Sequence, residues 1–159
     1  MRQAELLARR YAQTLLQIDP ANLYYQGELA DAHKMEGNFY RADGQWPAAR
    51  EISRKYRELM SGVSPAIYGT AQNAYRWLQM PILEAYLDEG TAAAAMGDTA
   101  AAAALLDKAH VGFGRLNPDK SPDAADFRKQ YVPWMLGEAK LVGQMGDWSA
   151  LEHRSTELL

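Results

Sequence analysis

The sequence has no cysteine among its 159 residues, and it has few β-branched side chains. Without cysteine the chain cannot form disulfides, thiolate nucleophiles, or cysteine-held zinc and iron–sulfur centres. Four Val, four Ile and five Thr stand against 27 Ala. Because alanine is the strongest helix former and β-branched residues favour strands, this composition predicts an all-α domain.

Excess positive charge and long apolar runs are also missing. Lys and Arg number 17 against 20 Asp and Glu, which gives a net charge of -3. Nucleic acids and anionic lipid surfaces attract clustered positive charge, so neither is expected as a partner. The most apolar window, residues 91–106, is interrupted by Gly97 and Asp98 and is too short to cross a bilayer. Residues 1–5 lead into no signal-peptide core, and we therefore expect no membrane insertion and a cytoplasmic location.

The sequence shows no catalytic or cofactor-binding motif. The histidines His33, His110 and His153 are far apart and lack the spacing of a zinc protease. No serine lies in a Gly-x-Ser-x-Gly turn, and the glycine pair Gly112 and Gly114 is not followed by a phosphate-loop lysine. We expect no catalytic site, no cofactor and no metal, so the chain is predicted not to be an enzyme.

Three similar turns divide the chain. Each begins with a glycine, at positions 44, 97 and 146, and continues with residues that suit the start of a helix. Glycine readily adopts the left-handed conformation that ends a helix, and Asp98 or Asp147 can cap the next one. Seven positions before each turn glycine stands another small residue, and one position further back stands a glutamate. These residues are Gly37, Gly90 and Ala139, and Glu36, Glu89 and Glu138.

The helical spacing of apolar residues around these turns predicts three helical hairpins after an initial helix. The hairpins cover residues 21–60, 65–114 and 121–158 of a single domain over 1–159, and the initial helix covers 2–18. Pro65 is expected to begin the long middle helix, and Pro81 to kink or break it. The expected first helices are 21–43, 65–96 and 121–145, and the expected second helices are 46–60, 98–113 and 148–158.

The order of small residue, turn glycine and later alanine resembles the tetratricopeptide repeat. The segment Ile18-Asp19-Pro20-Ala21-Asn22 resembles the loop that closes such a repeat. The turn glycines are 53 and then 49 residues apart, longer than the usual period of about 34 residues and similar to an elongated version found in bacterial signalling proteins, including kinase-associated regions. The resemblance implies an α-α superhelix, a TPR-like solenoid of about seven helices in antiparallel hairpins, that serves protein–protein interaction.

In this family the first helix of each unit lines a concave groove. Lys34 and Asn38 resemble the first half of a clamp that holds a partner's C-terminal carboxylate. Asp88, Pro133 and Gly137 stand where the rest of that clamp would need an amide and two cations. A groove of mixed charge is therefore expected rather than a complete clamp. The candidate groove residues are Lys34, Asn38, Arg41, Glu84, Leu87, Asp88, Thr91, Leu136, Lys140 and Gln144.

The resemblance implies a non-catalytic scaffold or regulatory domain that binds a protein or peptide, as part of a bacterial signalling protein. The alternative is a sensor that binds a small molecule in a pocket opened by Pro81. Because a repeat array needs capping at both ends, we expect the chain to be a fragment of a longer protein or to form a homodimer. The pocket of the alternative is expected near Tyr75, Trp77, Met80 and Tyr86.

The repeated glutamates Glu36, Glu89 and Glu138 occupy positions where the family usually has a buried leucine. A buried carboxylate can mark a functional site, but buried polar groups are normally satisfied by neighbouring groups. We favour a structural role, in which each glutamate bonds a Tyr, Trp, Ser or backbone group or lies at a solvent edge.

The second helix of the first unit carries a basic stripe. Arg50, Arg54 and Arg57 recur there at helical spacing and would suit an acidic partner. The pairs Glu51 and Lys55, and Arg54 and Glu58, each stand four residues apart, and such pairs stabilise an exposed helix surface. A solvated face with internal ion pairs is the favoured interpretation.

Overall fold

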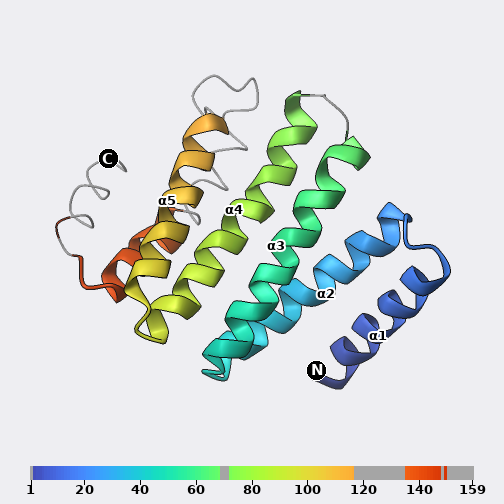
Figure 1. Ribbon diagram of the computed structural model, residues 1–159, viewed down its shortest axis with the longest axis horizontal. Coiled ribbons are helices and arrows are strands. Elements are labelled where there is room, and N and C mark those ends of the chain that lie inside the picture. Colours follow the sequence, from blue (N-terminus) through green and yellow to red (C-terminus); the bar gives the residue numbers. More distant parts are fainter. Residues whose placement is uncertain (1, 69–71, 117–134, 148, 150–159) are drawn as a thin grey trace.

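The computed structural model describes residues 2–68, 72–116, 135–147 and 149, and the regular structure in this part of the chain is entirely α-helical. The prediction of an all-α chain is confirmed. Five helices have defined bounds, and residues 135–144 form a further helical segment (Figure 1). The bounds are α1 Arg2–Ile18, α2 Leu23–Ala42, α3 Trp46–Tyr68, α4 Gln72–Ala95 and α5 Thr99–Leu116.

Helices that follow one another in the sequence lie against one another in space. α1 packs on α2, α2 on α3, α3 on α4, and α4 on α5. Figure 1 shows α3, α4 and α5 side by side, each running opposite to the one before it. The described part of the chain therefore has a helical-repeat-like architecture, in which each helix is stabilised mainly by its sequence neighbours.

The three turn glycines all adopt a left-handed backbone conformation. The angle φ is +69° at Gly44, +79° at Gly97 and +73° at Gly146, a region that costs other L-residues about 1–2 kcal/mol. After the second turn, the Asp98 carboxylate accepts a hydrogen bond of 3.1 Å from the Ala101 N–H at the start of α5. The turn glycines and the Asp98 cap confirm the predictions made from the sequence.

Buried glycines allow close contact between neighbouring helices. A Cβ atom at Gly37 on α2 would lie 3.1 Å from Ile52 Cγ2 on α3. A Cβ atom at Gly90 on α4 would lie 2.9 Å from Leu141 Cδ2 and 3.6 Å from Leu105 Cβ on α5. A larger side chain at either position needs the contacted side chains, or the helices that carry them, to shift, because protein interiors are close-packed.

The proline predictions were wrong in their helix boundaries. The second helix of the first unit was expected to end near residue 60, but α3 continues through Pro65 to Tyr68. α4 begins at Gln72 and runs through Pro81 without a break. Proline removes one backbone hydrogen bond from a helix, and the burial of Met80, Ile82 and Leu83 on either side of Pro81 stabilises the continuous helix.

The largest buried cluster joins α4, α5 and the helical segment 135–144. In a smaller cluster, Tyr56 of α3 packs against Ala30 of α2 and Ala85 of α4, so that small residues accommodate the aromatic ring. Both clusters lie between consecutive helices. The buried members of the larger cluster are Met80, Leu83, Leu87, Ala93, Ala102, Leu106, Ala109, Phe113, Met135, Leu141 and Val142.

The third predicted hairpin is described only in part. Its helical residues 135–144 fall within the first helix expected over 121–145, whereas the second helix expected over 148–158 lies outside the described residues, apart from position 149. Within the part that is described, no helix combines the length and the apolar character that a bilayer crossing requires.

Candidate functional site

A cavity of about 530 Å³ lies between α2, α4 and the helical segment 135–144. Every residue selected from the sequence as a groove position lines it, except Leu136, whose side chain is exposed elsewhere on the segment. We refer to this cavity as the central groove. Its lining residues are Lys34, Asn38, Arg41, Ala42, Trp46, Glu84, Leu87, Asp88, Thr91, Gly137, Lys140 and Gln144.

Helical spacing explains why these residues share one cavity. Positions three or four apart lie on the same face of a helix. On α2 the groove positions are 34, 38 and 41, on α4 they are 84, 87, 88 and 91, and on the third segment they are 137, 140 and 144. Three helices, each the first of its predicted hairpin, thus present one face to the same space.

Two ion pairs bridge α2 and α4 across the groove. The Lys34 Nζ atom lies 3.1 Å from Glu84 Oε2, and an Arg41 guanidinium nitrogen lies 2.9 Å from Asp88 Oδ2. Arg41 also donates hydrogen bonds to Asn38 Oδ1 and, at 3.3 Å, to Ser53 Oγ. The positive charges that α2 contributes are therefore already neutralised by α4.

Asp88 has the most perturbed carboxyl group in the groove. Burial raises the pKa of Asp88 above its ordinary value, and the neighbouring Arg41 guanidinium opposes that rise. The side chain nevertheless keeps about a third of its surface accessible. Asp88 is thus a partly desolvated carboxylate whose charge depends on Arg41.

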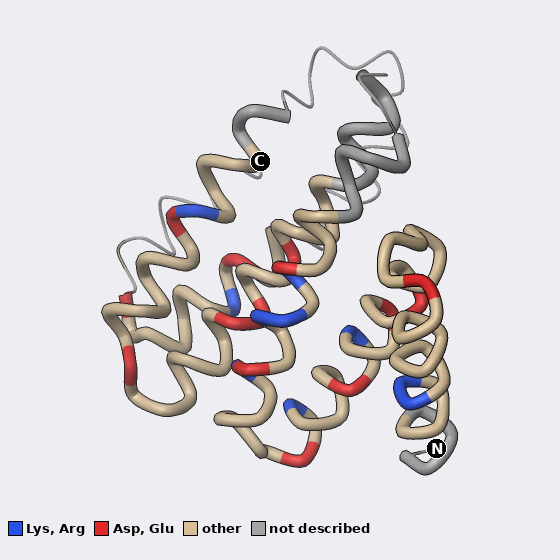
Figure 2. The backbone as a smooth tube through the Cα atoms, turned by 45° about the vertical axis from the view of Figure 1, so that its right-hand side comes forward, with Lys and Arg blue, Asp and Glu red and all other residues tan. Residues whose placement is uncertain are grey.

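The opposite wall of the groove carries a different charge pattern. Lys140 is exposed, and among the side chains that the structure describes no carboxylate lies within ion-pair distance of it. Thr91 and Gln144 add neutral polar groups, while the buried Leu87 lies close to Gly137 and provides apolar surface. Figure 2 shows acidic and basic positions interspersed over the helices rather than gathered by sign.

Some groove residues were not selected from the sequence. Trp46, at the start of α3, is partly buried and lines the groove. Ala42 and Gly137 also line it. Trp46 follows the turn glycine Gly44 by two residues, and this position at the end of a hairpin turn is the signal that could have placed it near the groove rim.

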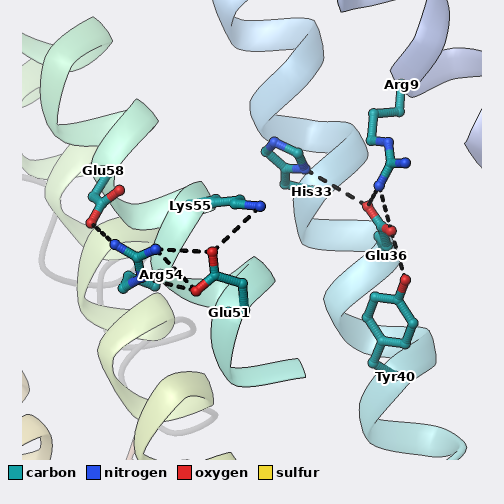
Figure 3. A network of polar contacts seen from close by, with 8 residues as sticks. All are labelled: Arg9, His33, Glu36, Tyr40, Glu51, Arg54, Lys55 and Glu58. Carbon is teal, nitrogen blue, oxygen red and sulfur yellow. Dashed lines mark hydrogen bonds and ion pairs between the residues drawn. The ribbon is translucent and has the colours of Figure 1, made fainter. Parts of the chain in front are cut away.

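The three repeated glutamates each bond a cationic or imidazole side chain from the preceding helix. Arg9 of α1 donates two hydrogen bonds to Glu36, at 2.7 and 2.8 Å (Figure 3). Arg57 of α3 donates to Glu89 at 3.0 and 3.2 Å. In the third case His110 Nδ1 of α5 lies 3.0 Å from Glu138 Oε1. The three inter-helix pairs are Arg9–Glu36, Arg57–Glu89 and His110–Glu138, which we call the glutamate pairs.

These partners differ from the Tyr, Trp, Ser or backbone groups expected from the sequence. Glu36 also has a partner of the expected kind, because the Tyr40 hydroxyl donates a hydrogen bond of 2.9 Å to it (Figure 3). Arg57 and His110 each stand 13 positions after a turn glycine. That shared position is a repeat signal, and it would have identified both partners.

The arginines of the basic stripe on α3 bond different carboxylates. Arg54 bonds Glu51 and Glu58 on the exposed face of the same helix (Figure 3). Arg50 and Arg57 reach other helices, where Arg50 pairs with Asp98 at 3.0 Å. Each arginine of the stripe therefore has a carboxylate partner within the molecule.

A second cavity, of about 640 Å³, opens between α3, the middle of α4 and the second half of α5. Of the aromatic residues proposed for a sensor pocket, Tyr86 lines it. Met80 is buried in the core instead, and the side chains of Tyr75 and Trp77 lie outside the described residues. The lining residues are Ser61, Gln79, Ile82, Leu83, Tyr86, Asp107, Lys108, Val111 and Gly112.

Comparison with known proteins assigns no family to the chain. No family model, no curated protein and no solved structure matches it. Within the described residues, no group of three or more His, Cys, Asp or Glu side chains is arranged to hold a metal ion.

Proposed function

We propose that this chain is a non-catalytic binding module, a tetratricopeptide-like superhelix that holds an extended segment of a partner protein in its central groove. It would serve as a scaffold or regulatory domain. The observation that carries this proposal is the convergence of three helix faces, from α2, α4 and residues 135–144, on one cavity of about 530 Å³.

The dimensions of the groove suit an extended peptide. Packed helices lie about 8–10 Å apart, so three helix faces in a row span roughly 20 Å. An extended chain covers about 3.3 Å per residue, and the groove would therefore contact about six residues of a partner. Asn38, Thr91 and Gln144 supply donors and acceptors that can bond a peptide backbone.

A selection from a displayed library of random peptides tests the groove directly. The immobilised chain is used for selection, and the peptides obtained are measured again with two variants. Thr91→Arg places a long side chain in the groove, and Ala103→Arg places the same side chain on an exposed position of α5. We expect Thr91→Arg to weaken binding at least tenfold and Ala103→Arg to leave it unchanged, with both variants melting like the wild type.

Two outcomes would overturn the proposal. The first is that no peptide is enriched over a control protein. The second is that selected peptides bind Thr91→Arg and the wild type equally well, since the binding surface would then lie elsewhere.

The second cavity supports a sensor function as the other candidate. Its volume of about 640 Å³ falls in the range of small-molecule sites, and Tyr86 and Leu83 supply aromatic and apolar surface. A thermal-shift screen of metabolites tests it, because a ligand at a hundred times its dissociation constant stabilises a protein by about 2.7 kcal/mol. If no metabolite raises the melting temperature, the sensor proposal fails.

A further inference from the structure

We propose that the central groove selects peptide segments that carry an Asp or Glu side chain, and that Lys140 pairs with this carboxylate. The inference rests on the proposed function, because it assumes that the groove is the binding site.

The argument begins with the charges that line the groove. Five ionisable side chains line it, and four of them already form the pairs Lys34–Glu84 and Arg41–Asp88. A partner carboxylate that approached Lys34 or Arg41 would have to compete with a carboxylate already in contact. Lys140 is the remaining cation of the lining.

Arg41 is the least available of the other cations. Its guanidinium contacts Asp88, Asn38 Oδ1 and the buried Ser53 Oγ together. Removing it from these groups would leave Asp88 desolvated without its counter-ion, which is costly for a partly buried carboxylate. The positive charges on the α2 side of the groove are therefore already paired with carboxylates when no ligand is bound.

The surroundings of Lys140 suit a single acidic side chain on an extended peptide. Gln144 lies one helical turn further along the same face, and Thr91 lines the groove from α4. These neutral groups can bond the peptide backbone on either side of the carboxylate, and Leu87 and Trp46 offer apolar surface for a neighbouring side chain. A positively charged residue at the same place would meet Lys140 without a counter-ion.

A side chain is favoured over a C-terminal carboxylate as the source of the charge. A terminal carboxylate is recognised by several donors gathered at one point, as in a backbone nest. Lys140 is a single ammonium, a point charge with three rotatable donors. Such a group needs only one carboxylate and imposes no chain end.

Four pools of nine-residue peptides test the proposal. The positions around the centre are degenerate, and the central residue is fixed as Glu, Gln or Lys in peptides blocked at both ends. The fourth pool has Gln at the centre and a free C-terminal carboxylate. Binding of each fluorescent pool is measured by anisotropy with the wild type, Lys140→Gln, Lys140→Glu and the control Arg10→Gln, in which an exposed arginine of α1 outside the groove loses its charge.

We expect the wild type and Arg10→Gln to bind the Glu pool about fivefold more tightly than the blocked Gln pool, since partly exposed ion pairs contribute up to about 1 kcal/mol. Lys140→Gln should lose this preference, and Lys140→Glu should prefer the Lys pool. High salt should reduce the preference, because salt screens exposed charges.

Each other outcome overturns the inference in a distinct way. Equal binding of all blocked pools keeps the groove as the binding site and overturns the acidic preference. If the free-carboxylate pool binds as tightly as the Glu pool, the groove recognises a chain end. If Lys140→Gln still prefers the Glu pool, a cation other than Lys140 recognises the carboxylate. If no pool binds the wild type, the proposed function fails as well.

Discussion

Several buried or partly buried carboxylates in the described part of the chain bond side chains of a neighbouring helix. The glutamate pairs each join residues 27 to 32 positions apart in the sequence. Glu89 and Glu138 are almost entirely inaccessible to solvent, with relative exposures of 7% and 2%. A buried carboxylate without a hydrogen-bonding partner or counter-ion destabilises a protein strongly, so each pair favours one register of the two helices that it joins.

Substitution of Glu89 should show how strongly the stability of the protein depends on a glutamate pair. We expect Glu89→Leu to lower the free energy of unfolding by about 3 kcal/mol, because Arg57 would remain half-buried without its partner. Glu89→Gln keeps an acceptor for Arg57 and should cost only about 1 kcal/mol. Urea unfolding followed by circular dichroism measures both values.

Two further variants test the cause of that effect. Glu58→Leu, on the exposed face of α3, should change stability by less than about 0.5 kcal/mol. The double variant Arg57→Leu, Glu89→Leu should recover part of the loss, because no uncompensated charge remains. This account would be contradicted if the double variant lost more free energy of unfolding than the two single variants lose together.

His33 should make the stability depend on pH. Burial lowers the pKa of His33, and the charges of Arg9 and Lys55 act in the same direction, while Glu36 opposes them (Figure 3). The unfolded chain, in which the ordinary pKa is about 6.5, therefore takes up this proton at a higher pH than the folded chain. The contribution of His33 to stability is therefore fully present above pH 6.5 and is lost as the pH is lowered towards the pKa of His33 in the folded state.

Comparison with His33→Gln isolates this contribution. We expect the melting temperature of the wild type to fall more between pH 7.5 and 5.5 than that of the variant, since the other titrating groups are common to both. Equal falls in the two proteins would show that His33 does not titrate differently in the folded and unfolded states.

At the scale of the helices, glycine sets how closely neighbours approach. Gly90→Val should lower the free energy of unfolding by about 1–3 kcal/mol, because the added atoms meet Leu141 and Leu105. Gly27→Val, on α2, is the matched control, since nothing lies within 4 Å of a Cβ atom at that position. Thermal unfolding compares the two, and equal stability of both variants would contradict the close packing at Gly90.

The elements show which features a single sequence can predict. Turn glycines and Asp98 were identified because left-handed backbone and helix capping are local properties. Most of the groove lining could be selected because the resemblance to the tetratricopeptide repeat implies which face of each first helix lines a groove, and residues on one helix face recur three or four positions apart. The ends of α3 and α4 could not be predicted, because α3 continues through Pro65 and the packing of the residues beside Pro81 stabilises a continuous α4. The partners of the glutamates were missed because pairing between helices is not a local property.

At the scale of the whole molecule, the helices form a chain of neighbours. α3 and α4 each pack against a helix on either side, whereas the substantial contacts of α1 in the described part are with α2. In such an architecture stability is close to a sum of local and nearest-neighbour contributions, so segments open with different free energies.

Hydrogen exchange should reveal these differences in the free energy of opening. We expect amides of α4 to be the most protected and those of α1 the least, because α4 contributes to the largest buried cluster and, among the described helices, α1 packs mainly against α2. Mass spectrometry of peptides from each helix measures the protection. Arg9→Ala removes the bonds to Glu36 and should speed exchange in α1 while leaving α4 unchanged. Equal acceleration in both helices would show that the chain opens as one cooperative unit, and the nearest-neighbour account would then be wrong.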